Sequence, residues 1–215
     1  MVDDHLQAVY DAVLHGELEG ARDHVRQSLA AGTPAVSLLK GGLIAAMSEV
    51  GRLFEAGEYY VPEMLVAARA MKGGLEILRP LLIDSDVRPV GKVVIGTVAG
   101  DLHDIGKNLV AMLLEGAGFE VYDLGVDVSP QKFVEAVEQH RPEIVAMSAL
   151  LTTTMAQMET TLDALRRAEV LQNARVMVGG APLNQAFADK IGADGYAPDA
   201  SQAATLARHL VAGES

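Results

Sequence analysis

The sequence predicts an α/β protein in which an N-terminal four-helix bundle, residues 1–88, precedes a domain built on a five-stranded parallel sheet, residues 89–215. Two observations support this prediction. In the first part, apolar residues recur at intervals of three and four, as in amphipathic helices. In the second part, short apolar runs rich in Val and Ile alternate with helical stretches, and strands separated in this way form parallel sheets with right-handed crossovers.

Four helices are predicted in the first part, at residues 3–15, 17–32, 34–56 and 62–80. Glycine follows or ends the first three, which is common because glycine readily adopts the left-handed conformation at a helix terminus. Proline stands at the favoured first position of the third and fourth helices, and Pro80 is expected to close the fourth. The short connections indicate a small bundle. Residues 83–91 break the periodicity and are interpreted as a linker and a hinge.

In the second part, strands are predicted at residues 92–95, 120–124, 143–147, 175–178 and 194–197. The intervening helices are expected near residues 105–116, 130–140, 155–170 and 184–191, and a last helix near 201–211. The expected strand order is 2-1-3-4-5, the flavodoxin-like variant of Rossmann-type folds.

Composition excludes several classes of function. The formal net charge is -12 with no cluster of Lys or Arg, so nucleic acid is not expected as a partner. No cysteine is present, so disulfides, thiolate metal sites and cysteine nucleophiles are absent. The N-terminus lacks the features of a signal peptide, and no apolar run reaches the roughly 18–20 residues of a membrane span. We therefore expect no membrane association and a cytoplasmic location.

The segment from Gly96 to Asn108 is a glycine-rich loop between the first predicted strand and the following helix. It contains His103 between Asp101 and Asp104. A phosphate-binding P-loop needs four residues between its first glycine and Gly-Lys-Ser/Thr, whereas five separate Gly100 from Gly106 here. The G-x-G-x-x-G dinucleotide fingerprint is also absent. Neither phosphate-binding interpretation fits.

The D-x-H-D-x-G-K-N sequence of this loop resembles the cobalamin-binding signature of methionine synthase and of corrinoid proteins of methyltransferase systems. The latter act on methylamines, methanol, glycine betaine or aryl ethers. The resemblance implies cobalamin as cofactor, with His103 replacing the cofactor's own dimethylbenzimidazole as the lower cobalt ligand. It also implies that the whole loop contacts the cofactor: Gly100, Asp101, Leu102, His103, Asp104, Ile105 and Gly106.

The predicted topology places three segments around one crevice. In such sheets, ligands bind at the carboxyl ends of the strands, where the strand order reverses. The His103 loop follows the first strand, residues 148–154 follow the third, and Gly179-Gly180 follow the fourth. A neutral imidazole can bind a metal through one nitrogen when a carboxylate holds the other, and Asp101 is the candidate for that carboxylate.

The resemblance also assigns roles to more distant residues. It implies a relay of His103, Asp101 and a hydroxyl, and Thr154 stands where methionine synthase has serine. In the helical part, Phe54 and Val61 match residues that lie over the upper face of the corrin in corrinoid methyltransferases. The positions matching those that line the pocket for the nucleotide tail are Ser148, Thr152 and Ala200, and Leu150 is a further expected cofactor contact.

The function implied by the resemblance is that of a methyl carrier that needs partner enzymes. A substrate-specific methyltransferase would methylate Co(I), and a second methyltransferase would pass the methyl group of methyl-Co(III) to tetrahydrofolate or a thiol. A reductive activase is a further expected partner. The alternatives are a cobalamin-dependent sensor and the cobalamin subunit of a radical mutase. Such sensors carry a basic DNA-binding segment before the same two domains, and this chain has neither the length nor the charge for one. The usual partner of a mutase cobalamin domain is a barrel, so the helical cap argues against the second alternative.

Overall fold

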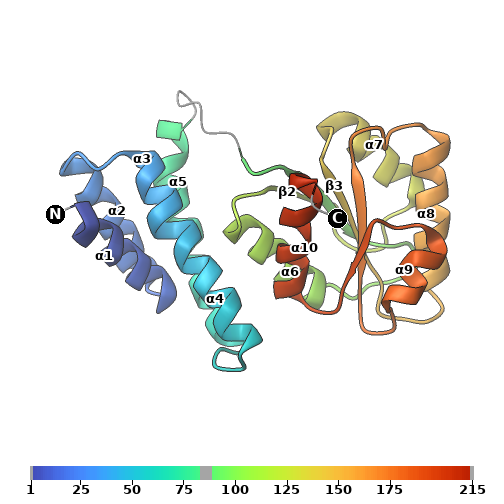
Figure 1. Ribbon diagram of the computed structural model, residues 1–215, viewed down its shortest axis with the longest axis horizontal. Helices are drawn as coiled ribbons and strands as arrows, with labels where there is room; N and C mark the ends of the chain where they lie inside the picture. The colour runs from blue at the N-terminus through green and yellow to red at the C-terminus, as the bar shows by residue number, and fades with distance from the viewer. Residues whose placement is uncertain (1, 83–88, 214–215) are drawn as a thin grey trace. The chain divides into compact units, whose positions relative to one another are not determined.

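The computed structural model describes residues 2–82 and 89–213, and the chain divides into two compact units, Met1–Arg88 and Pro89–Ser215 (Figure 1). The predicted hinge at residues 83–91 falls largely on residues 83–88, which lie outside the described residues.

The first unit is helical. Its elements are α1 (Val2–Leu14), α2 (Leu18–Ala30), α3 (Ala35–Ser37), the π-helix η1 (Leu38–Ile44), α4 (Ala45–Glu55) and α5 (Val61–Leu82). Helix α1 packs on α2, η1 and α4, and α2 packs on α5. Fully buried Val9, Val25, Leu43, Val50 and Leu78 come from five different elements and form the interior of this bundle.

The third predicted helix differs from expectation because a π-helical turn interrupts it. Residues 34–56 form α3, η1 and α4 in place of one regular α-helix, and Pro34 is the N-cap instead of the first helical residue. A Cβ atom on Gly42 would lie 2.8 Å from the Val9 side chain, so α1 and η1 approach at a distance that only glycine permits. The wider turn is thus linked to tertiary packing.

Two predicted helix ends were also wrong. Helix α5 continues through Pro80 to Leu82. A proline in the last turn removes one hydrogen bond, to the carbonyl four residues earlier, and its fixed φ remains helical. Helix α8 (Met155–Arg167) ends before residue 170, and Glu169 adopts a left-handed φ of 56°.

The second unit contains a parallel sheet in the predicted order β2-β1-β3-β4-β5. The strands are β1 (Lys92–Thr97), β2 (Glu120–Asp123), β3 (Ile144–Ser148), β4 (Arg175–Gly179) and β5 (Gly195–Ala197). The other helices are α6 (Ile105–Gly116), α7 (Pro130–His140), α9 (Gln185–Ile191) and α10 (Ala200–Ala212). Strand order reverses between β1 and β3, which pair from Val93–Ile144 to Thr97–Ser148.

Helices cover both faces of this sheet (Figure 1). Successive side chains of a strand point to opposite faces. Accordingly, Val93 and Ile95 pack in the cluster that includes α6 and α10, whereas Val94 packs in the cluster that includes α7, α8 and α9. Burial on both faces explains the continuous apolar runs by which the strands were predicted.

None of the helices in the two described ranges combines the length and the apolar character needed to cross a membrane.

Candidate functional site

The His103 loop leaves the carboxyl end of β1 and enters α6. Thr97, the last residue of β1, donates its hydroxyl to the His103 carbonyl at 2.8 Å. Val98 forms an isolated parallel bridge with Val128, beyond the end of β2. The loop therefore begins beside the ends of β2 and β3. It then returns to the end of β1, where Thr97 holds His103, and α6 starts at Ile105.

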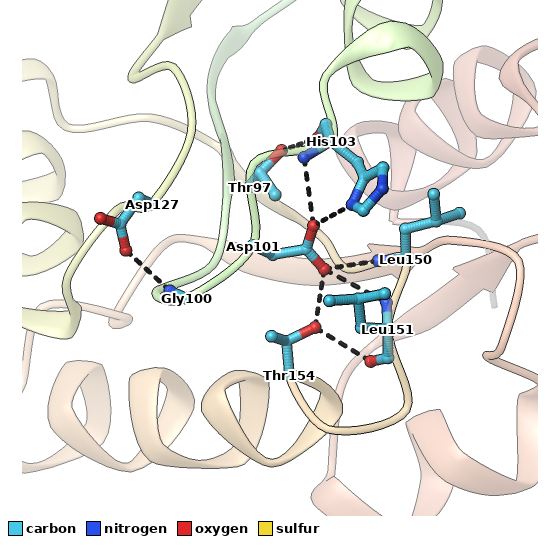
Figure 2. A network of polar contacts seen from close by, with 8 residues as sticks. All are labelled: Thr97, Gly100, Asp101, His103, Asp127, Leu150, Leu151 and Thr154. Carbon is cyan, nitrogen blue, oxygen red and sulfur yellow. Dashed lines mark hydrogen bonds and ion pairs between the residues drawn. The ribbon is translucent and has the colours of Figure 1, made fainter.

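Asp101 is the buried centre of the polar network in Figure 2, with no exposed surface. Its Oδ1 accepts hydrogen bonds from the His103 backbone N–H at 3.1 Å and lies 2.7 Å from His103 Nδ1. Its Oδ2 accepts from the backbone N–H groups of Leu150 and Leu151, at 2.8 and 3.2 Å. The Thr154 hydroxyl adds a bond to Oδ2 at 2.6 Å. One carboxylate thus joins the loops that follow β1 and β3.

These contacts determine the charge of Asp101. Burial by itself would raise the pKa of this carboxyl group, because it disfavours the ionised form. The hydrogen bonds from Thr154, the Leu150 amide and His103 outweigh burial and hold the pKa well below its usual range. Asp101 is therefore an ionised carboxylate that can only accept hydrogen bonds.

The charge of Asp101 fixes the tautomer of His103. Because the carboxylate has no proton to give, Nδ1 of a neutral His103 must carry the hydrogen that lies between them. Nε2 then has a free lone pair, and no described residue forms a hydrogen bond with it. The His103 side chain is 51% exposed, and Figure 2 shows its ring with one nitrogen towards Asp101 and the other directed away. This arrangement presents a nitrogen ligand at the edge of the sheet.

The surroundings of His103 are apolar and exposed. Leu102 and Ile105 are 72% and 75% exposed, and Leu150 and Leu151 are about two-fifths exposed. Large apolar side chains are usually buried, so four exposed ones that follow the carboxyl ends of β1 and β3 mark a binding surface. A flat macrocycle with a largely apolar face and a central metal fits a surface with this composition and one nitrogen ligand. The donor set and the apolar residues therefore suit cobalamin.

The described residues bring no three His, Cys, Asp or Glu side chains into an arrangement able to hold a metal ion. Structural sites for a bare metal such as zinc usually supply four protein ligands. A single histidine can bind a metal whose other positions are already filled, as most of those of cobalt are in a corrin.

The other predicted residues of the second unit lie at the start of α6 and beyond the carboxyl ends of β3, β4 and β5. Ser148 and Gly179 are paired across the ends of β3 and β4. Thr152 is exposed, and Asp104 and Gly106 lie exposed where α6 begins. At Gly180, φ is 138° and a Cβ atom would lie 1.9 Å from the Ala149 carbonyl oxygen, so only glycine fits there. Ala200 is buried at the first residue of α10.

The predicted cap residues lie in the other unit. Phe54 and Val61 are half-buried on either side of the connection between α4 and α5. Their assignment to the upper face of the corrin stays a prediction.

Two acidic residues at and beyond the end of β2 were not predicted as part of the site. Asp123, the last residue of β2, pairs with Lys107, and Asp127 accepts a hydrogen bond from the Gly100 amide. The only sequence signal was their place at the end of a predicted strand and just after it. The analysis also missed the amides of Leu150 and Leu151, because backbone donors leave no trace in residue type.

Comparison with known proteins identifies the family. Residues 91–205 match a family described as B12 binding domain, and residues 5–79 match a second family with the same description. The chain is 42% identical over 203 residues to trimethylamine corrinoid protein 1 of Methanosarcina acetivorans, which covers 94% of each chain.

Two solved structures are similar over nearly the whole chain. A chain in the structure of the methanol:cobalamin methyltransferase complex of Methanosarcina barkeri matches with a TM-score of 0.85 and 29% identity. The match covers 98% of this chain and 81% of the chain in the complex. A cobalamin-binding protein of Desulfitobacterium hafniense matches with a TM-score of 0.77 and 31% identity, covering 95% and 98%. The chain belongs to the cobalamin-binding corrinoid proteins of methyltransferase systems, the family that includes the methylamine corrinoid proteins.

Proposed function

We propose that this protein is a methyl carrier that binds cobalamin with His103 as the lower cobalt ligand, in place of dimethylbenzimidazole. The observation that supports the proposal is the His103 ring, held at Nδ1 by ionised Asp101 while Nε2 is free among exposed apolar side chains. When bound, cobalamin supplies a cobalt ion whose bond to a methyl group can form and break.

Each residue of the loop has a separate part in this proposal. His103 donates the Nε2 lone pair, and Asp101 keeps the proton on Nδ1. Thr154 holds the Asp101 carboxylate from the opposite side. Leu102, Ile105, Leu150 and Leu151 supply apolar contact. The polar tail of the cofactor would run between the strand ends, along Ser148, Thr152, Gly179, Gly180 and Ala200, and Phe54 and Val61 would cover the upper face.

The proposed partners follow from the carrier role. A protein of similar structure is part of a methanol:cobalamin methyltransferase complex. We therefore propose a substrate-specific methyltransferase as donor and a second methyltransferase, acting on tetrahydrofolate or a thiol, as acceptor. A reductive activase completes the set. The proposed location is the cytoplasm.

Reconstitution with hydroxocobalamin tests the cobalt ligand. Wild-type protein should retain the cofactor through gel filtration, and the reduced Co(II) form should show, in electron paramagnetic resonance (EPR), a splitting that changes when the protein carries ¹⁵N-histidine. His103→Gly should lose the isotope effect and bind at least about tenfold more weakly, since a metal–ligand contact is gone. His209→Gln, an exposed histidine of α10, is the matched control. An isotope-independent wild-type spectrum would refute histidine ligation.

Methyl iodide tests the carrier function. After anaerobic reduction, the wild-type holoprotein should react to give a stable methylated cofactor. A strong preference for adenosylcobalamin, with no methylated product, would instead favour a sensor or a mutase subunit.

A further inference from the structure

The segment Asp123–Val128, which connects β2 to α7, lies against the His103 loop at several points. The Thr97 amide donates to the Gly125 carbonyl at 3.0 Å, and the Val128 amide donates to the Thr97 carbonyl at 2.9 Å. Thr97 in turn holds the His103 carbonyl through its hydroxyl. The end of β1 therefore lies between this segment and the histidine.

Asp127 holds the chain on both sides of the Gly100–Asp101 peptide. Its Oδ1 accepts the Gly100 N–H at 2.7 Å (Figure 2). Its own N–H donates to the Asp101 carbonyl at 3.0 Å. Both contacts are made to the chain that carries the Asp101 carboxylate. The side chain and the main chain of one residue thus hold the two peptide groups that flank the Gly100–Asp101 peptide.

The backbone of Asp127 is unusual in a way that agrees with this role. Its φ is 51°, in the left-handed region that residues other than glycine rarely adopt. Such conformations raise the free energy of the folded chain and persist only where the surroundings determine them. Asp and Asn tolerate the region better than most residues, and Asp also supplies the acceptor that Gly100 needs.

Asp123 holds the start of α6, the helix that follows the His103 loop. Lys107, four residues after His103, is 1% exposed in its side chain, and its Nζ lies 2.7 and 2.6 Å from the two oxygens of Asp123. Asp123 Oδ1 also accepts the Gly125 N–H at 2.9 Å. A buried lysine needs such a partner, so the first turn of α6 is tied to the end of β2.

We propose that Asp123–Val128 is a positioning element for the metal-ligating histidine, with Asp127 as its central residue. The inference rests on the proposed role of His103 as cobalt ligand. Asp127 touches neither cofactor nor reacting atoms; it acts by holding the chain on both sides of the Asp101 side chain, at the Gly100 N–H and the Asp101 carbonyl, and therefore fixes the carboxylate that orients His103. Without its acceptor, the Gly100 N–H would no longer be held, this stretch of the loop would move among several positions, and the share of molecules with His103 correctly aligned would fall.

Three variants separate the acceptor from the backbone conformation. Asp127→Gly removes the acceptor but tolerates φ above zero, whereas Asp127→Asn keeps both an acceptor oxygen and the tolerated φ. Asp163→Asn, which removes an exposed charge on α8, is the control for net charge. If Asp127→Gly does not fold, Asp127→Ser replaces it, because a serine hydroxyl is one bond too short to reach the Gly100 amide.

The first measurement uses the protein without cofactor. Hydrogen exchange of the Gly100 amide should be roughly tenfold faster in Asp127→Gly than in wild type, and near wild type in Asp127→Asn and Asp163→Asn.

The second measurement uses Co(II) holoprotein labelled with ¹⁵N-histidine and titrated with unlabelled imidazole. Imidazole displaces histidine from cobalt, and EPR distinguishes the two nitrogens by isotope. Asp127→Gly should be half-displaced at roughly one-tenth of the wild-type imidazole concentration, and Asp127→Asn should restore the wild-type value.

The outcomes distinguish the two levels of the argument. If wild-type spectra do not depend on the histidine isotope, the proposed ligand role of His103 fails. If they do, and Asp127→Gly equals wild type in both measurements, the ligand role stands and the positioning role of Asp127 is overturned.

Discussion

Replacing Asp101 by asparagine would change which ring nitrogen of His103 carries the proton, while the side chain at position 101 keeps nearly the same size and shape. Oδ2 of Asp101 accepts three hydrogen bonds, from the amides of Leu150 and Leu151 and the hydroxyl of Thr154. Oδ1 accepts from His103 alone, through its amide and Nδ1. An asparagine has one acceptor oxygen and one NH₂ group. Its NH₂ group must therefore face either the three donors at the Oδ2 position or the two His103 donors at the Oδ1 position.

The smaller conflict lies on the histidine side. With its oxygen directed to the three donors, the amide NH₂ faces His103 Nδ1, which must then accept a hydrogen bond. The proton of the neutral ring moves to Nε2, which can no longer bind a metal. A similar change of tautomer is known when a buried Asp that holds a catalytic histidine becomes Asn.

The magnitude follows from the hydrogen bond that must be broken. To bind cobalt, the variant has to return the proton to Nδ1 of His103. The Nδ1–H group then has no charged acceptor, because the carboxylate of Asp101 has been replaced by an amide. A hydrogen bond to a charged group contributes about 1.5–3 kcal/mol. We therefore expect the equilibrium constant for histidine ligation to fall by roughly 10- to 150-fold.

Two assays check this expectation. The ¹⁵N chemical shifts of the His103 ring in the cofactor-free protein report which nitrogen carries the proton, and the imidazole titration of the Co(II) form reports the ligation constant. Asp163→Asn serves again as the control for lost charge. If Nε2 of the Asp101→Asn variant is unprotonated at neutral pH and the titration matches wild type, the tautomer argument is refuted.

Three further results are expected. Thr154→Val should raise the pKa of Asp101 and lower the free energy of unfolding by about 1–3 kcal/mol in chemical denaturation, because it leaves a buried carboxylate short of a donor, whereas Thr154→Ser should stay near wild type. Gly180→Ala should cost about 2 kcal/mol or more in the same assay, because its Cβ atom meets the Ala149 carbonyl, while Gly106→Ala, which has open space, should change little; equal stabilities would contradict this. The pKa of Asp101 is lower in the folded than in the unfolded state, so the ionised carboxylate stabilises the fold above the ordinary pKa of about 4, and this stabilisation declines as the pH falls below that value. The difference in free energy of unfolding between wild type and Asp101→Asn should therefore shrink below about pH 4. A difference that does not change with pH would contradict the lowered pKa of Asp101.

The fold of the second unit could be predicted because local pattern and topology agree there. Strands buried on both faces read as unbroken apolar runs, such as Val93 to Ile95, and the connecting helices leave few possible strand orders. The π-helical turn at η1 could not be predicted in this way. At this turn Gly42 lies against Val9, which is 33 residues earlier in the chain, and such a contact is visible only after folding.

The candidate site divides along a similar line. The contact of Asp101 with His103 is local and was expected from spacing, and the contact with Thr154, 53 residues later, was expected only from a resemblance. The main-chain donors of Leu150 and Leu151 are independent of side-chain identity, so no sequence pattern marks them. Asp127 was missed because an acidic residue in a loop is usually solvated.

The position of Asp101 connects the orientation of the histidine with the geometry of the binding crevice. Strand order reverses between β1 and β3, so the loops that follow these strands diverge at this point and leave room for a ligand. The carboxylate bonds to His103 in the first loop and to Leu150, Leu151 and Thr154 in the second. The loops cannot separate at this point without breaking hydrogen bonds to a buried charge, each of which contributes about 1.5–3 kcal/mol. The same contacts that keep the proton on Nδ1 therefore also hold the two sides of the crevice at a fixed distance.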